Sequence, residues 1–345
     1  MTPSFGRCAA LTAAAALALG GCSVVGGDPE PTAGGTVTLV THDSFALSDG
    51  LLDQFTAETG WEVELVAPGD GGALVNQLIL TQDSPLGDAV FGIDTTFASR
   101  AVDAGVLAQY TSPAAVDGFE TLGGYLTAVD QGDVCLNVDL EWFADADLPV
   151  PEGFEDLLEP GYADLTVVTS PVSSSPGLAF LLATVAHFED GWQDYWRGLL
   201  GNGAKVADGW SDAYYVDFSG SEGAGPRPIV LSYSSSPAAE VGEDGVARTA
   251  NVAATCFRQV EYAGVIAGAE NPDGAEALVD FLLSEEVQAD IPGSMYMYPV
   301  TDVALPEEWA QHAPLTEDPL TLDPATIAEK RGSWQEEWVA LLEER

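Results

Sequence analysis

The chain has 345 residues, of which 46% are hydrophobic, and a formal net charge of −45 from 10 Lys and Arg against 55 Asp and Glu. This length can supply two lobes with buried cores, and the hydrophobic content excludes a disordered tail. The negative charge argues against binding to nucleic acid or anionic headgroups and suits a cationic ligand, although much of it can serve solubility or a high-salt habitat.

The N-terminus has the features of a signal peptide over residues 1–21, with Arg7 followed by an apolar run too short to span a membrane. The run ends in Leu-Gly-Gly-Cys, which resembles the bacterial lipobox and predicts that Cys22 is lipidated. Residues 22–35 are rich in Gly and Pro and predict a flexible tether. We expect an extracytoplasmic protein anchored to the cell membrane; the alternative is ordinary secretion with Cys22 as a free thiol.

Alternating strands and helices open the mature chain. Patterns of hydrophobic residues predict strands at 36–40, 61–66 and 88–93 and helices at 48–60, 71–79 and 98–106. Strand, helix and strand in so few residues indicate a mostly parallel sheet. Ligands bind beyond the carboxyl ends of such strands, so residues 42–44 and 94–96 should line one edge of a cleft.

An extended segment at 128–139 predicts a crossover into a second lobe. The second lobe is expected to contain strands at 165–169 and 228–233 and helices at 154–158, 178–188 and 192–200. Ser175 fits a helix N-cap and Pro176 the first helical position. Free N–H groups and serine hydroxyls at this helix start form a candidate anion site, or the serines only cap the helix.

The last part of the chain returns to the first lobe. We expect a return strand at 257–267, a helix at 271–282 and a C-terminal helix at 334–342. The predicted fold is α/β, a two-lobe periplasmic-binding-protein-like fold of type II with the ligand in the interlobe cleft. The expected lobes are residues 36–133 plus 259–298, and 134–258 plus 299–345 with the C-terminal helices.

Two cysteines remain in the mature chain besides Cys22. Cys135 and Cys256 should lie on the two crossovers, close enough to form a disulfide in an oxidising compartment. Such a bridge would close a loop of about 120 residues.

Motifs of known enzymes are missing from the sequence. It contains no Gly-x-Ser-x-Gly elbow, Ser-x-x-Lys, His-Glu-x-x-His or P-loop, and the adjacent His42, Asp43 and Ser44 are poorly spaced for a triad. Its three histidines are too scattered for a zinc site. We therefore expect a binding protein, with no enzyme activity, cofactor or metal.

One segment combines aromatic, hydroxyl and acidic side chains: Gly209-Trp210-Ser211-Asp212-Ala213-Tyr214-Tyr215. These groups suit a flat cationic ligand, which they can hold by stacking, cation–π attraction and charge pairing. The alternative is a core aromatic cluster beside a helix start.

An ordered set of short motifs resembles the thiamine-binding proteins of ABC importers. The motifs are Thr41-His42-Asp43-Ser44-Phe45, Gly92-Ile93-Asp94, Ser174-Ser175-Pro176-Gly177-Leu178, the segment from Gly209 to Tyr214, Leu231-Ser232-Tyr233, Ser236-Pro237-Ala238 and Met297-Tyr298-Pro299-Val300. The resemblance runs from about Val37 to the C-terminal tail. It implies a monomer that binds thiamine, thiamine monophosphate or thiamine diphosphate between its lobes and delivers the ligand to an ABC permease.

The resemblance also implies roles for individual residues. Trp210 and Tyr233 would pack on the rings, Asp94 would be a polar partner, and Ser174 and Ser175 would contact a phosphate or hydroxyl. The whole predicted ligand site consists of His42, Asp43, Ser44, Asp94, Thr95, Ser174, Ser175, Trp210, Ser211, Tyr214, Tyr233, Ser236 and Tyr296.

Three positions depart from the family pattern. His42 and Ala239 stand where the family has tyrosine, and Tyr296 stands where it has tryptophan, which leaves the affinity and the preferred ester open. One alternative function is ferric-ion binding in the same fold through Tyr214 and Tyr215. Another is a lipid-anchored acidic surface or adhesion protein.

Overall fold

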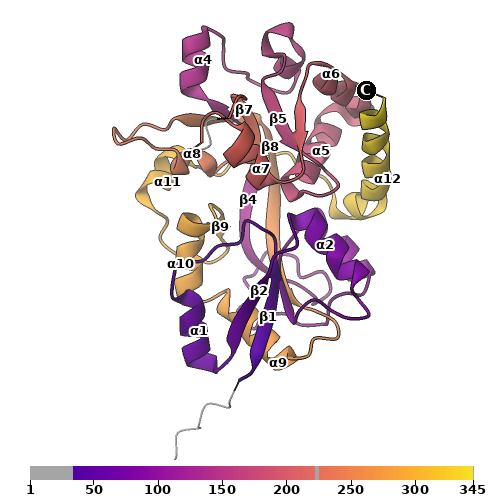
Figure 1. The fold of residues 1–345 in the computed structure, drawn as a ribbon, viewed down its shortest axis with the longest axis vertical. Coiled ribbons are helices and arrows are strands. Elements are labelled where there is room, and N and C mark those ends of the chain that lie inside the picture. The colour runs from indigo at the N-terminus through magenta and orange to yellow at the C-terminus, as the bar shows by residue number, and fades with distance from the viewer. Residues whose placement is uncertain (1–33, 222–224, 345) are drawn as a thin grey trace, which may run out of the picture.

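The computed structural model describes residues 34–221 and 225–344 (Figure 1). The expected signal peptide over residues 1–21 and the lipidation site Cys22 lie outside the described residues, as does most of the expected tether. Within the described ranges, no helix is long and apolar enough to cross a membrane.

Within the described ranges, a mixed sheet of nine strands runs through both halves of the molecule. Eight strands follow the order β2-β1-β3-β8-β4-β7-β5-β6, and β9 pairs with β4. Parallel pairs form at the two ends, where β1 lies between β2 and β3 and β5 lies between β6 and β7. The strands are β1 Thr36–Thr41, β2 Glu62–Val66, β3 Ala89–Asp94, β4 Thr127–Asp139, β5 Thr166–Thr169, β6 Lys205–Ala207, β7 Ile229–Tyr233, β8 Thr249–Val265 and β9 Tyr298–Pro299.

Helices cover the two parallel ends and define two lobes (Figure 1). The first lobe contains β1 to β3 with α1 Leu51–Thr59, α2 Gly71–Leu80, α3 Ala98–Asp103, α9 Pro272–Phe281 and α10 Glu285–Ser294. The second lobe contains β5 to β7 with α4 Leu140–Ala146, α5 Ser175–Phe188, α6 Trp192–Gly201, α7 Trp210–Asp212, the π-helical turn η4 Ala213–Asp217, and α8 Ser236–Ala239. Short 3₁₀ turns are η1 Glu155–Leu158, η2 Pro160–Tyr162 and η3 Glu189–Gly191. The C-terminal helices are α11 Glu307–His312 and α12 Pro324–Glu343.

Two long antiparallel strands join the lobes. β4 has 13 residues and β8 has 17, and Figure 1 shows both running from the lower lobe into the upper one. The disulfide between Cys135 and Cys256 connects these strands, with the two Cα atoms 4.2 Å apart. The bridge expected from the sequence is therefore present, and the α/β class is confirmed.

The C-terminal helix α12 returns to the second lobe. Its Trp338 meets Trp196 of α6 edge to face, with ring centroids 5.5 Å apart. Arg331 of the same helix donates to the carbonyl oxygen of Thr96 in the first lobe at 3.1 Å. α12 thus contacts both lobes.

Several element boundaries differ from the expectations. β8 begins at Thr249, whereas the predicted strand begins at 257. The prediction begins too late because the first residues of β8 lack the alternation of buried and exposed side chains that marks a strand. α12 starts ten residues earlier than predicted, and α4, α10 and α11 were not expected. α10 was missed because Pro292, usually a helix breaker, lies inside it.

The start of α5 is shifted by one residue from the prediction. Ser174 is the N-cap: its backbone is extended and its hydroxyl accepts from the Gly177 N–H, whereas Ser175 is already helical. The expectation that Ser175 caps this helix is wrong. The N–H of Ser175 donates instead to Asp70 of the other lobe, a partner that local sequence cannot reveal.

Candidate ligand site

A cavity of about 280 Å³ lies between the two lobes. The first lobe contributes the loop after β1, Asp70 before α2, and the segment after α10. The second lobe contributes the start of α5, the α7 region and the end of β7, and β8 contributes Glu261. The lining residues are His42, Asp43, Ser44, Phe45, Ala46, Asp70, Ser175, Pro176, Trp210, Ser211, Tyr215, Tyr233, Glu261, Ser294, Met295, Tyr296 and Met297.

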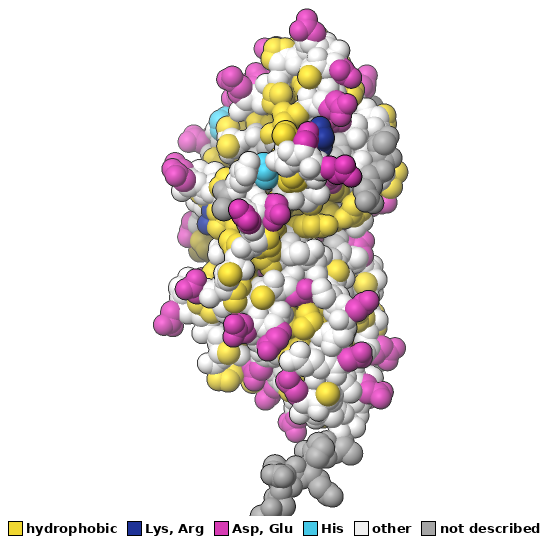
Figure 2. Space-filling model, turned by 90° about the vertical axis from the view of Figure 1, so that its left-hand side faces the viewer, with side chains coloured by type: hydrophobic (Ala, Val, Ile, Leu, Met, Phe, Trp, Pro, Cys, Tyr) yellow, Lys and Arg dark blue, Asp and Glu magenta, His cyan; other side chains and the backbone are white. Residues whose placement is uncertain are grey.

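Acidic and apolar side chains are distributed differently on the surface. On the face shown in Figure 2, acidic groups are scattered over both lobes, whereas apolar side chains gather at the waist between them. On this face the acidic groups are therefore not concentrated in one place. Charges inside the cavity must be considered separately.

The second lobe supplies an aromatic wall, which we define as Trp210, Tyr215 and Tyr233, with Tyr214 packed behind it. Tyr214 stacks on the indole of Trp210 with centroids 5.0 Å apart and planes at 19°. Tyr215 and Tyr233 meet the indole edge to face at 5.4 Å and 6.3 Å. The indole N–H donates to the Ser232 hydroxyl at 2.9 Å, so the ring is held in one orientation.

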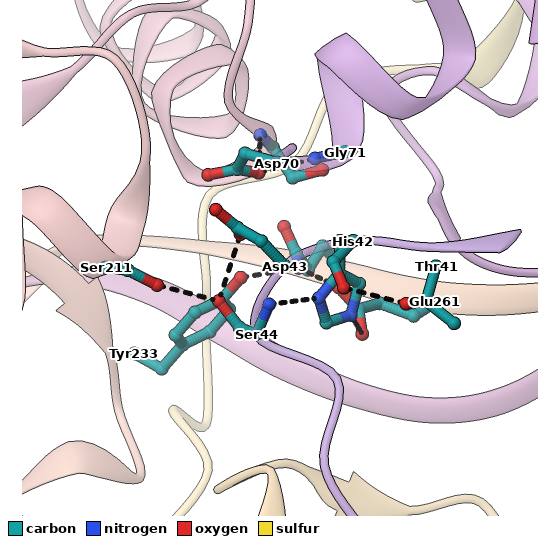
Figure 3. Close-up of polar contacts among 11 residues, drawn as sticks. Thr41, His42, Asp43, Ser44, Asp70, Gly71, Ser211, Tyr233 and Glu261 are labelled. Carbon is teal, nitrogen blue, oxygen red and sulfur yellow. Dashed lines mark hydrogen bonds and ion pairs between the residues drawn. The ribbon is translucent and has the colours of Figure 1, made fainter. Parts of the chain in front are cut away.

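Asp70 connects the lobes across the cavity (Figure 3). As the N-cap of α2 it accepts from the Gly71 N–H at 2.6 Å, and it also accepts from the N–H groups of Ser175 and Trp210 at 3.0 Å each. Burial raises the pKa of Asp70, and these hydrogen bonds lower it by less, so its pKa lies above the ordinary value. Asp70 is thus a half-buried carboxylate that joins the second-lobe backbone to the first lobe.

His42 lies beside Glu261 on the floor of the cavity (Figure 3). Its Nδ1 accepts from the Ser44 N–H at 3.2 Å, and its Nε2 is 3.6 Å from Oε2 of Glu261. Burial lowers the pKa of His42, but the carboxylates of Glu261, Asp70 and Asp43 together raise it above the ordinary value. Gly92 makes room for the ring, since a Cβ there would lie 2.1 Å from Cδ2 of His42.

Asp94 lies behind this floor. Its side chain is fully buried, and Oδ1 accepts from the N–H and the hydroxyl of Thr96, each at 2.5 Å. Burial raises the pKa of Asp94 to about 6, although hydrogen bonds from Ser175 and Thr96 oppose the shift. Asp94 therefore contributes charge near the cavity without lining it.

The structure brings eight of the thirteen predicted site residues to the cavity and leaves five away from it. Those on the lining are His42, Asp43, Ser44, Ser175, Trp210, Ser211, Tyr233 and Tyr296. Those away from it are Asp94, Thr95, Ser174, Tyr214 and Ser236.

Four of those five residues make contacts that account for their place. Thr95 pairs through its backbone and hydroxyl with Val260, Ser174 caps α5, Tyr214 donates to Glu240, and Ser236 bonds to Ser232. These residues support the lining from behind.

Two acidic lining residues were not predicted. The Asp70-Gly71-Gly72 sequence indicated a helix start, but the second-lobe partners of Asp70 are distant in the chain. Glu261 could have been found, because a carboxylate in the middle of the buried strand β8 needs a partner or a function.

The departures from the family pattern fall at different places. His42 and Tyr296 line the cavity, whereas Ala239 is exposed at the end of α8 and does not. Tyr296 has φ = 57°, a left-handed conformation that is rare for an aromatic residue. Its carbonyl oxygen accepts from the Ser235 hydroxyl of the second lobe, which holds this backbone in place.

Comparisons with known proteins agree on one family. Residues 86–324 match the family described as bacterial extracellular solute-binding protein. The chain is 31% identical over 316 residues to a thiamine-binding periplasmic protein from Escherichia coli, covering 88% of this chain and 92% of that one.

Solved structures share the same architecture. A periplasmic thiamin binding protein matches with a TM-score of 0.79 and 28% identity over 89% of this chain and 96% of its own. Iron-bound HitA from Pseudomonas aeruginosa matches with a TM-score of 0.67 over 88% and 99% of the two chains. Its identity is 20%, so this second likeness concerns the fold alone. The two-lobe fold expected from the sequence is confirmed.

Proposed function

The chain belongs to the family of bacterial extracellular solute-binding proteins, and from this premise we propose that it captures thiamine or its phosphate esters and delivers them to an ABC importer. The single observation that supports this ligand best is the composition of the cavity. An aromatic wall on the second lobe faces the carboxylates of Asp70 and Glu261. Relatives at about 30% identity are named for thiamine binding.

The two walls suit the two properties of thiamine. Its thiazolium ring is flat and permanently cationic, so it is attracted both to aromatic faces and to carboxylates. Trp210 is 9% exposed and presents a fixed indole, and Tyr233 approaches it from β7. Asp43, Asp70 and Glu261 line the same cavity and supply negative charge. We assign ring packing to Trp210 and Tyr233 and charge compensation to the three carboxylates.

The start of α5 is the candidate position for a phosphate or hydroxyl of the ligand. Ser175 and Pro176 line the cavity there, and the N–H of Ser175 already donates to Asp70. A phosphate bound at this point would compete with the Asp70 carboxylate for the same N–H. The relative affinities of thiamine and its esters therefore report how firmly Asp70 holds this helix start.

Closure of the lobes around the ligand is the proposed mechanism. Besides Asp70, the interlobe contacts include Ser44 with Ser211, whose hydroxyl oxygens are 3.3 Å apart, and the Ala73 N–H with the Ser173 carbonyl at 3.0 Å. We assign residues 36–133 plus 259–298 to one moving lobe and 134–258 plus 299–345 to the other. Lipidation at Cys22 would keep the protein, as a monomer, at the membrane that holds the permease.

Ferric-ion binding receives less support from the placement of the tyrosines. Tyr215 lines the cavity and is 43% exposed, but Tyr214 is buried and its hydroxyl donates to Glu240 at 2.9 Å. The two rings are at 86° to each other. Both phenol oxygens would have to turn toward one ion, which requires breaking the Tyr214–Glu240 bond.

Calorimetric titration of refolded, ligand-free protein tests the proposal. Thiamine, its monophosphate and its diphosphate are expected to bind in the micromolar range or tighter, and ferric citrate is expected to bind weakly or not at all. The reverse ranking, with a measurable heat of binding for ferric citrate and none for thiamine, would reject thiamine as the ligand.

A further inference from the structure

Two carboxyl groups lie next to each other at the cavity floor. Glu261 lines the cavity from β8, and Asp130 is its direct partner on β4. Asp130 is fully buried, Glu261 is 5% exposed, and neither oxygen of Asp130 has a hydrogen-bond partner among the described residues. Asp130 does not line the cavity, so a ligand would meet it only through Glu261.

In the part of the chain that the structure describes, no basic side chain pairs with Asp130. On the neighbouring strands it faces Glu261 of β8 and Pro299 of β9, and the nearby Arg258 is paired with Asp133. Two adjacent buried carboxylates cannot both remain ionised without a large cost in Coulomb energy, and a shared proton removes one of the charges. Burial, and then the charge of Glu261, raise the pKa of Asp130 well above its ordinary value.

The other side of Glu261 faces His42. Because Nδ1 of His42 accepts the Ser44 N–H, the ring proton in this arrangement is on Nε2, which faces Glu261. A second proton on the imidazole would break the bond to Ser44. The remaining titratable or polar groups around this pair are Asp43, Asp70, Asp94, Tyr233 and Gln259, none of which is cationic.

We propose that Asp130 and Glu261 share a proton in the empty cavity and release it when a cationic ligand enters, so that ligand affinity is linked to pH. The inference rests on the proposed function for the nature of the ligand. In the step, the O–H bond of the shared carboxyl breaks, the proton goes to solvent, and the cation takes over its role beside Glu261. Net charge in the site is conserved. Asp130 is a positioning residue that acts through Glu261.

The direction of the pH effect follows from this exchange. A bound cation stabilises the carboxylate form, so binding releases a proton and affinity rises with pH through the range where the pair titrates. Full release of one proton corresponds to about a tenfold change in Kd per pH unit. A partial release gives a proportionally smaller slope.

Titration calorimetry with thiamine can count the released protons. Each titration is performed from about pH 5 to about pH 8 in pairs of buffers with different ionisation enthalpies. Asp130→Asn keeps the size and a hydrogen-bond donor toward Glu261 but cannot titrate. We expect it to release fewer protons than the wild type and to bind with equal affinity at low pH. At high pH its affinity should be weaker, by up to about tenfold for each pH unit over which the wild type releases its proton. Asp53→Asn, an exposed carboxylate on α1, is the matched control and should match the wild type.

The outcomes separate this inference from the proposed function. Any titration of the ligand itself or of His42 is common to wild type and Asp130→Asn, so the difference between them isolates Asp130. Equal proton release in both proteins would overturn the inference even if thiamine binds tightly. The inference would also be overturned if the wild-type protein released no protons on binding thiamine at any pH, a measurement that requires no variant.

A second measurement does not depend on the ligand. The infrared band of a protonated carboxyl group should be present in the ligand-free wild type at neutral pH and be lost in Asp130→Asn. Lack of thiamine binding would reject the proposed function, and this band would still decide whether Asp130 holds the proton. Its absence from the wild type would overturn the inference.

Discussion

The two walls of the cavity differ in how their side chains are held and in whether they ionise. The aromatic wall of the second lobe is held by satisfied hydrogen bonds, such as the one from the Trp210 indole to Ser232, and it contains no group that ionises near neutral pH. Behind the floor formed by the first lobe and β8, the carboxylates of Asp94 and Asp130 are buried and have oxygens without a hydrogen-bond partner among the described residues. Ring packing is therefore preorganised and insensitive to pH, whereas the negative charge costs stability and responds to protons.

Removing the disulfide between β4 and β8 should have the largest effect on stability, although both walls of the cavity stay intact. Cys135→Ser with Cys256→Ser opens a loop with a sequence separation of 121 residues. The chain-entropy model predicts a loss of about 4–5 kcal/mol in unfolding free energy. Urea denaturation of the double variant against the wild type measures it. A loss under about 1 kcal/mol would mean that residual structure restricts the unfolded chain about as much as the disulfide does.

Asp94→Asn tests whether the buried carboxylates behind the cavity make the stability of the protein depend on pH. The pKa of Asp94 is raised from 3.8 to about 6, so the folded state binds its proton more tightly than the unfolded state. This contribution to stability is present below about pH 4 and is lost as pH rises through about 6, a change of about 3 kcal/mol at most.

The variant keeps an acceptor for Thr96 but cannot titrate. Its unfolding free energy, measured by urea denaturation between about pH 4 and about pH 7, should vary less with pH than that of the wild type. Parallel pH profiles for the two proteins would show that Asp94 is not the titrating group.

Trp210→Ala tests the aromatic wall. Loss of the stacking face should weaken thiamine binding by about 1–3 kcal/mol, and by the same amount at every pH, because the indole does not ionise. Trp210→Phe keeps an aromatic face but loses the hydrogen bond to Ser232, so its affinity for thiamine should lie between those of the wild type and Trp210→Ala. Calorimetry on the three proteins measures this order. An unchanged Kd in the alanine variant would remove Trp210 from the site.

Gly92→Ala adds one methyl group beside the ring of His42 at the floor of the cavity. Gly92 has φ = 95°, and the added methyl would meet the His42 ring. We expect a loss of about 1–2 kcal/mol in stability together with weaker thiamine binding. Gly105→Ala is a control for backbone strain alone, because its φ is also positive at 70° but a Cβ there meets nothing within 4 Å. Equal losses of binding in both variants would contradict a role for His42 packing.

The local patterns in the sequence were enough to predict one wall of the cavity. Trp210, Ser211 and Tyr215 lie within one short segment, and hydroxyl and aromatic groups at the ends of β1 and β7 followed from the alternation of strands and helices. The carboxylate floor was largely missed, because Asp70 and Glu261 acquire their partners from segments more than one hundred residues away or from neighbouring strands.

The sequence by itself determined the α/β class, the order of most elements, the cysteines available for a bridge and the aromatic segment, since these depend on periodicity, local propensity and spacing. Only the tertiary structure decided that Asp70 bonds to the second lobe, that Tyr214 points away from the cavity, and that Asp130 and Glu261 share a buried position. The physical reason is that burial, long-range pairing and the resulting pKa shifts depend on which side chains meet in space, which the order of residues along one strand or helix does not specify.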